Sequence, residues 1–244
     1  MIYTGRRTLG ESTRRAIPAL GTVFYKGEWI EGAPGHLLAP HSFLLEQPPN
    51  ITLESHFHRN NQFQIFVEGD GTIGRHAIGP VVVHYAGAYT GYGPLISGTE
   101  GLKYFTLRRV REDGYIPITQ RSKNMLPGPK RHASSESWQS LPGVELEEIT
   151  AAEVHSLIPK SNDGLMASAI RLPPDSPLQL EHLQAGEGQF IFMLAGQLVG
   201  PQITMSLWEH IFVPAGEPFP KLCAGGGGAE LLCFSLPSPA TEYI

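Results

Sequence analysis

Short runs of apolar residues, each broken by glycine, proline or asparagine, recur along most of the chain. In the first half they are HSFLLEQ, NITLESHFH, QFQIFVEGDG, PVVVHYAG and GLKYFTLRR, between residues 41 and 109. Their mixture of β-branched and aromatic side chains is typical of strands. Helical periodicity is nearly absent, and the best candidate is TAAEVHSLI at residues 150–158, which begins with a capping-type threonine. The pattern predicts an all-β protein with few short helices.

A second set of strand-like runs follows residue 165, and the two sets can be aligned. The segment 62–69 matches the segment 189–196, because in both a Gln-Phe pair opens an apolar strand that ends in a glycine-containing turn. A repeat of this length indicates a duplicated domain. We therefore expect an N-terminal domain at 1–112, a linker with the short helix at 113–165, and a C-terminal domain at 166–244.

Composition and charge narrow the class of protein. The 28 glycines and 21 prolines among 244 residues favour short strands and tight turns over a helical bundle. The net charge of -5 argues against binding to nucleic acid, which needs clustered basic residues. The short run Arg108, Arg109 and Arg111 is interpreted as a solvated strand end.

The sequence predicts a cytoplasmic protein that does not bind membranes. No apolar run approaches membrane-spanning length, and no apolar segment follows the arginines of the N-terminus as it would in a signal peptide. Two cysteines, Cys223 and Cys233, are too few for a disulfide scaffold, and we expect free thiols.

The residues around one histidine pair resemble the first motif of the cupin superfamily. That motif is a glycine, five residues, His-x-His, three or four residues, a glutamate, six residues and a glycine. Here Asn50 stands for the first glycine, His56 and His58 match, Gln62 replaces the glutamate, and Gly69 closes the motif. The resemblance implies a bicupin, with two tandem cupin-type antiparallel β-barrels of the jelly-roll, or double-stranded β-helix, kind.

The second cupin motif is incomplete in both halves. Its histidine position falls near Thr99 in the first half and on Phe219 in the second, although Pro214, Ala215 and Gly216 fit the Pro-x-Gly element. The second half also lacks the histidine pair, since residues 183 and 185 are leucine and alanine. No metal is predicted in the second barrel, which we interpret as structural or as an apolar pocket.

His56 and His58 form the candidate metal site, together with Gln62. Strand residues two apart project to the same face, so the two imidazoles converge. They suit one divalent transition metal, namely Fe(II), Mn, Ni, Cu or Zn. A neutral glutamine would bind the ion more weakly than a carboxylate would. His84 is the best third donor, followed by His76, Tyr92 and Glu54.

The leading functional hypothesis is a metal-dependent oxygenase that acts on a small organic molecule. The resemblance suggests this reaction, and His84 or Tyr92 would handle protons. A metal-dependent lyase or isomerase would use the same residues. A third reading has no metal: the histidines hydrogen-bond to Asn60, Asn61 and the glutamines around a polar pocket that binds or senses a small molecule. Cupin barrels often pair, so a homodimer is compatible with the resemblance, although no segment marks an interface.

Overall fold

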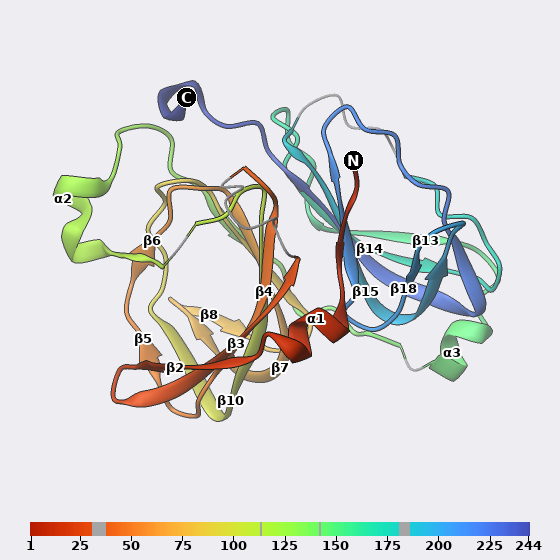
Figure 1. The fold of residues 1–244 in the computed structure, drawn as a ribbon, viewed down its shortest axis with the longest axis horizontal. Coiled ribbons are helices and arrows are strands. Elements are labelled where there is room, and N and C mark those ends of the chain that lie inside the picture. The colour runs from red at the N-terminus through yellow and green to blue at the C-terminus, as the bar shows by residue number, and fades with distance from the viewer. Residues whose placement is uncertain (31–37, 113, 142, 181–185) are drawn as a thin grey trace. The chain divides into compact units, whose positions relative to one another are not determined.

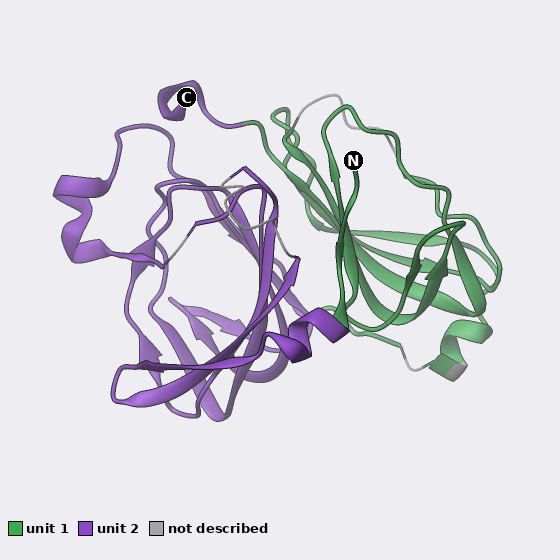
Figure 2. Ribbon diagram, viewed as in Figure 1, with its two compact units in different colours: residues 1–7, 138–238 green, residues 8–137, 239–244 purple. Residues whose placement is uncertain are grey.

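The computed structural model describes residues 1–30, 38–112, 114–141, 143–180 and 186–244 (Figure 1). The chain divides into two compact units (Figure 2). Residues 8–137 and 239–244, in purple, are called the N-terminal unit; residues 1–7 and 138–238, in green, are called the C-terminal unit. Each is built on its own antiparallel sheet, which confirms the prediction of an all-β fold.

The N-terminal unit contains a nine-stranded sheet whose main path runs β12-β9-β7-β10-β4-β3-β2, with β5 paired to β10 and β8 to β7. Two further strands, β6 and β11, pair with each other. The strands are β2 (Arg15–Ala19), β3 (Thr22–Ile30), β4 (His41–Gln47), β5 (Thr52–Leu53), β6 (His56–Phe57), β7 (Gln62–Ile73), β8 (His76–Ile78), β9 (Val82–Ala86), β10 (Leu95–Arg108), β11 (Ile116–Pro117) and β12 (His132–Ser134). The short helices are α1 (Arg7–Ser12), η1 (Ile118–Gln120), α2 (Arg121–Asn124) and η2 (Thr241–Tyr243).

The C-terminal unit contains a seven-stranded sheet in the order β1-β17-β15-β18-β14-β13, with β16 paired to β15. Its strands are β1 (Tyr3–Gly5), β13 (Glu153–Ile158), β14 (Met166–Leu172), β15 (Gly188–Val199), β16 (Thr204–Met205), β17 (His210–Pro214) and β18 (Cys223–Leu236), and its helix is α3 (Gly143–Glu147). The boundary between the units falls after residue 137, within the stretch that the sequence assigns to a linker.

The helix predicted over residues 150–158 is wrong. Residues 153–158 form β13, an edge strand that pairs antiparallel with β14 and places Val154 opposite Ile170. Helix propensity is a weak preference, and pairing with a neighbouring strand of the sheet overrides it. The helix of this stretch lies earlier in the chain, as α3.

The two units repeat the same strand geometry at equivalent positions. Strands β7 and β15 each span 12 residues, and their partners β10 and β18 each span 14. Gly69 and Gly196 both have positive φ, and a Cβ at either would lie 2.0 or 2.2 Å from the carbonyl oxygen of Gly101 or Gly228. Only glycine allows that approach. The shared contact supports the alignment of the two halves.

Each unit has its own apolar core beside its sheet. The core of the N-terminal unit includes Phe66, Leu95 and Tyr104, while that of the C-terminal unit includes Ile191 and Leu231. Both cysteines are free, as expected. Among the residues that the structure describes, no helix is both long and apolar enough to cross a membrane.

Candidate functional site

The histidine pair lies where β6 ends and the chain turns toward β7. The backbone of His56 pairs with that of Tyr92 through two hydrogen bonds of 3.0 and 3.1 Å. His56 also lies opposite Pro117 of β11. The His56 and His58 rings are both buried, with centroids 5.4 Å apart. β11 on one side and the Tyr92 backbone on the other thus fix the backbone of His56.

A directed chain of hydrogen bonds links His56 to a buried arginine. Because Arg108 can only donate, its Nε–H to Gln62 Oε1 (2.9 Å) orients the Gln62 amide. Gln62 Nε2 then donates to the Tyr92 hydroxyl (2.7 Å), which donates to His56 Nε2 (3.0 Å). His56 Nδ1 in turn donates to the backbone carbonyl of Glu54 (2.7 Å). Each polar atom in this series of hydrogen bonds therefore has a donor or an acceptor opposite it.

Arg108 is the central residue of the site, and the sequence interpretation of it was wrong. It was assigned to a solvated strand end, but only 2% of its surface is exposed. It is the last residue of β10, opposite Gln62 in the register with β7. Its guanidinium also lies 3.1 and 3.3 Å from the ring nitrogens of His58, and Nη1 donates to the backbone carbonyl of Glu112 (2.8 Å). Strand side chains alternate, so Arg108 shares a face of β10 with the hydrophobic Tyr104 and with Thr106, and this spacing was the sequence signal for its burial.

Burial keeps His56, His58 and Tyr92, which lie around Arg108, in their neutral forms. Burial lowers the pKa of His56 to about 4, against the opposing hydrogen bond to Glu54. Burial and the charge of Arg108 hold the pKa of His58 well below its usual value. Burial also raises the pKa of Tyr92 above its usual value. At neutral pH both imidazoles are uncharged and the phenol is protonated.

A cavity of about 260 Å³ opens onto these residues within the N-terminal unit. One side of its lining is polar and includes His56, His58, Gln62, Tyr92 and Arg108. Most of the remainder is apolar and is supplied by β2 to β5: Ile17, Ala19, Phe24, Phe43, Leu45 and Leu53. The charged side chains of the lining are Lys26, Arg108 and Glu112. An apolar wall facing a few polar groups is the usual form of a small-molecule site.

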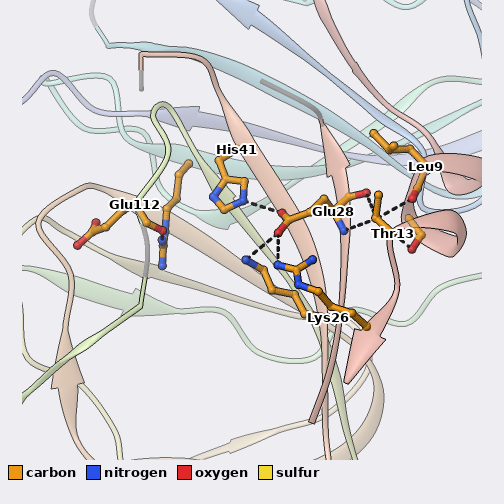
Figure 3. Close-up of polar contacts among 9 residues, drawn as sticks. Leu9, Thr13, Lys26, Glu28, His41 and Glu112 are labelled. Atoms are coloured by element: carbon orange, nitrogen blue, oxygen red, sulfur yellow. Dashed lines mark hydrogen bonds and ion pairs between the residues drawn. The ribbon is translucent and has the colours of Figure 1, made fainter. Parts of the chain in front are cut away.

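Glu28 balances the charge of Lys26 beside the cavity (Figure 3). Its carboxylate lies 3.0 Å from Lys26 Nζ, 2.9 Å from Arg15 Nη2 and 2.7 Å from His41 Nε2. Burial would raise the pKa of Glu28, but the bond from His41 and the charge of Lys26 lower it overall. Thr13 fixes the Glu28 backbone through bonds of 2.8 and 3.0 Å. Glu28 therefore stays ionised next to Lys26.

The other predicted donors have different surroundings. His84 Nδ1 bonds to Ser134 Oγ (2.8 Å), and its ring lies 5.3 Å from that of Tyr92 without lining the cavity. Its Nε2 is buried and has no partner among the described residues. His76 bonds to the backbone of Ser135. The Glu54 side chain is exposed. Among the described side chains of these predicted donors, that of Tyr92 is therefore the one that bonds to both His56 and Gln62.

The donor set in this arrangement does not fit a divalent metal. The nitrogen of His56 that would bind an ion accepts the Tyr92 hydroxyl, and Gln62 Oε1 accepts the Arg108 guanidinium. A permanent positive charge lies about 3 Å from His58 and would repel a dication bound there. No group of three or more histidine, cysteine or acidic side chains in the described part of the chain is placed to hold a metal ion.

At the equivalent position of the C-terminal unit, the residues that the structure describes do not reproduce this chemistry. Gln189 and Ser235, which lie opposite each other on β15 and β18, occupy the places of Gln62 and Arg108. The space beside them amounts to only about 10 Å³. His210 is buried and bonds to the Trp208 carbonyl. Residues 182–185, with the predicted replacements of the histidine pair, lie outside the described residues.

Comparisons with known proteins identify the fold. The chain resembles the nickel(II) complex of the pirin YhhW from Escherichia coli, with 13% identity, a TM-score of 0.56, and coverage of 98% of this chain and 100% of that one. It resembles oxalate decarboxylase from Bacillus subtilis, a protein with Mn(II) centres, with 12% identity, a TM-score of 0.55, and coverage of 94% and 77%.

A protein from Nostoc punctiforme that is proposed to be a dioxygenase matches at 12% identity and a TM-score of 0.56, with coverage of 96% and 78%. These are cupin-fold proteins, and at such identities the likeness concerns the fold alone. No family model and no curated protein matches the sequence.

Proposed function

We propose that the N-terminal unit binds a small organic acid in its cavity without the help of a metal. The observation that carries this proposal is the position of Arg108, whose buried guanidinium lines the cavity among the residues expected to hold an ion. A carboxylate is the natural partner of a guanidinium, because hydrogen bonds between ionised groups are shorter and stronger than neutral ones. The protein then acts by binding or sensing its ligand.

The walls of the cavity define the rest of the ligand. Phe24, Phe43, Leu45 and Leu53 offer apolar surface to its body. The volume of about 260 Å³ is below the range of roughly 300–1,000 Å³ that is common for ligand pockets. A single six-membered ring with one acidic substituent is therefore the size of ligand we expect.

The other charges of the lining allow an anion to bind. Glu28 balances Lys26, and the carboxylate of Glu112, 3.9 Å from His58 Nδ1, accepts bonds from the Arg59 backbone and the Asn60 side chain, both 2.9 Å. Because His58 is neutral, it adds no repulsion to a carboxylate and can donate a hydrogen bond. Arg108 thus determines the charge preference of the site.

A matched pair of ligands tests the proposal. Benzoate and benzamide have nearly the same shape and differ in charge, so isothermal titration calorimetry of both compares the charge preference directly. We expect benzoate to bind roughly 10- to 100-fold more tightly, because hydrogen bonds to charged groups contribute about 1.5–3 kcal/mol. Equal affinities, or a preference for the amide, would contradict the proposal.

The metal-dependent oxygenase is the second candidate, and a metal-dependent lyase or isomerase would use the same site. The nickel(II) and Mn(II) of two structures with this fold favour it. In this chain it requires the Arg108 guanidinium to leave both His58 and Gln62, so that these side chains can turn to an ion. An equivalent of bound metal in the purified protein would favour this candidate.

We further propose that the chain is a bicupin whose C-terminal barrel is structural. Equal strand lengths and the paired glycine contacts support the duplication. The neutral Gln189 and Ser235 and the filled space beside them support the loss of a site there. Binding in the N-terminal unit should accordingly saturate at one ligand per chain.

A further inference from the structure

A second polar row lies on the cavity wall next to the pair formed by Arg108 and Gln62. Strand side chains alternate, so Thr106 shares the inward face of β10 with Arg108, and it lies opposite Gln64 of β7. Gln64 and Thr106 both line the cavity. Because residues two apart along a strand are separated by roughly 7 Å, the backbone of Gln64 lies about that far from the backbone of Gln62.

The two glutamines differ in how their amides are bonded. The amide oxygen of Gln62 accepts a hydrogen bond from Arg108, and its amide nitrogen donates one to Tyr92. Gln64 is 3% exposed, and its Oε1 has no hydrogen-bond partner among the described residues. A buried carbonyl without a donor costs free energy, so such a group in a native structure requires an explanation. Gln64 itself lines the cavity, and a side-chain rotation that turns this carbonyl toward the space would let a ligand group satisfy it.

We infer that Gln64 is a specificity residue that accepts a hydrogen bond from a hydroxyl group of the ligand. This inference rests on the proposed function, because the carboxylate at Arg108 fixes one end of the ligand. The ligand class is then a compact hydroxy acid whose hydroxyl lies about 7 Å from the carboxylate, two strand residues along the wall. A ring with the two groups on opposite sides, such as 4-hydroxycyclohexanecarboxylate, has a separation of that order.

A buried water between Gln64 and a neighbouring histidine is the competing explanation for the acceptor without a partner. His84 lies opposite Gln64 in the register of β7 with β9, and its Nε2 also has no partner among the described residues. His84 does not line the cavity, so a ligand does not contact it. A buried water at this place would satisfy Gln64 whatever the ligand carries. The two explanations predict different ligand preferences.

The test compares 4-hydroxycyclohexanecarboxylate in its trans form with cyclohexanecarboxylate, by isothermal titration calorimetry on the full chain. We expect the hydroxy acid to bind about tenfold more tightly, which is the order of one hydrogen bond to a buried acceptor. In Gln64→Met the preference for the hydroxy acid over cyclohexanecarboxylate should fall to about one. Methionine keeps the length of the side chain and removes its acceptor.

Gln47→Met is the matched control. Gln47 is equally buried, its Oε1 also has no partner among the described residues, and it does not line the cavity. This variant should keep the full preference for the hydroxy acid. Equal binding of the two acids to the parent protein would overturn the inference and leave the proposed function standing. Failure of both acids to bind would overturn the two together.

Discussion

Replacement of Arg108 by methionine should abolish the preference for acids over amides. The guanidinium is the cation at the polar wall of the cavity, so benzoate should lose roughly 10- to 100-fold in affinity while benzamide binds with little change. The variant should also be less stable, by about 3 kcal/mol, because Gln62 Oε1 and the Glu112 carbonyl lose their donor. Calorimetry and urea unfolding measure the two effects separately.

Arg108→Lys separates charge from geometry at the same position. Lysine keeps the positive charge but lacks the planar fork of donors. The lysine variant should retain part of the preference for benzoate, but it should lose the hydrogen bond that orients the Gln62 amide. If Arg108→Met bound benzoate as tightly as the parent protein, the ligand would be held elsewhere and the role of Arg108 would be limited to stability.

The largest loss of stability is expected from Glu230 in the C-terminal unit. Its carboxylate is fully buried and accepts bonds from Arg171 Nε (3.0 Å), Trp138 Nε1 (2.9 Å), the Leu141 backbone (3.2 Å) and the Ser140 hydroxyl. Glu230→Leu leaves a cation and several donors without this acceptor. Removal of one partner of a buried ion pair costs about 3–5 kcal/mol, which urea unfolding followed by tryptophan fluorescence would detect.

Glu153→Leu provides the control, because Glu153 contacts the same arginine from the surface. Its side chain is 44% exposed and lies 3.4 Å from Arg171 Nη1. An exposed ion pair contributes about 0–1 kcal/mol, so this variant should unfold close to the parent protein. Equal effects of the two substitutions would show that burial does not determine the importance of the Glu230 contacts.

Much of the fold could be predicted from local patterns. Alternating β-branched and aromatic runs between turn residues predicted the strands, and the match of 62–69 with 189–196 predicted the repeat that Gly69 and Gly196 display. The segment 150–158 failed because its local signal was weak and β14 offers it a partner strand. Sequence shows propensity, whereas the pairing of an edge strand depends on the whole sheet.

The site was predicted in part. His56, His58 and Gln62, which were selected by their spacing, all line the cavity, as does the named candidate Tyr92, and their role as metal ligands stays a prediction. Arg108 was missed because a charged residue near a strand end is usually solvated. Its burial depends on the register of β10 with β7, which places it opposite Gln62, and local sequence does not determine that register.

We propose that the cavity binds an organic acid without a metal. The most direct test is benzoate titration of protein purified without a metal-affinity tag, before and after treatment with a chelator, with metal content measured by mass spectrometry on the same samples. We expect far less than one equivalent of metal and the same dissociation constant in both titrations. Near one equivalent of a transition metal, with binding lost after chelation, would contradict it and restore the metal-dependent oxygenase as the leading hypothesis.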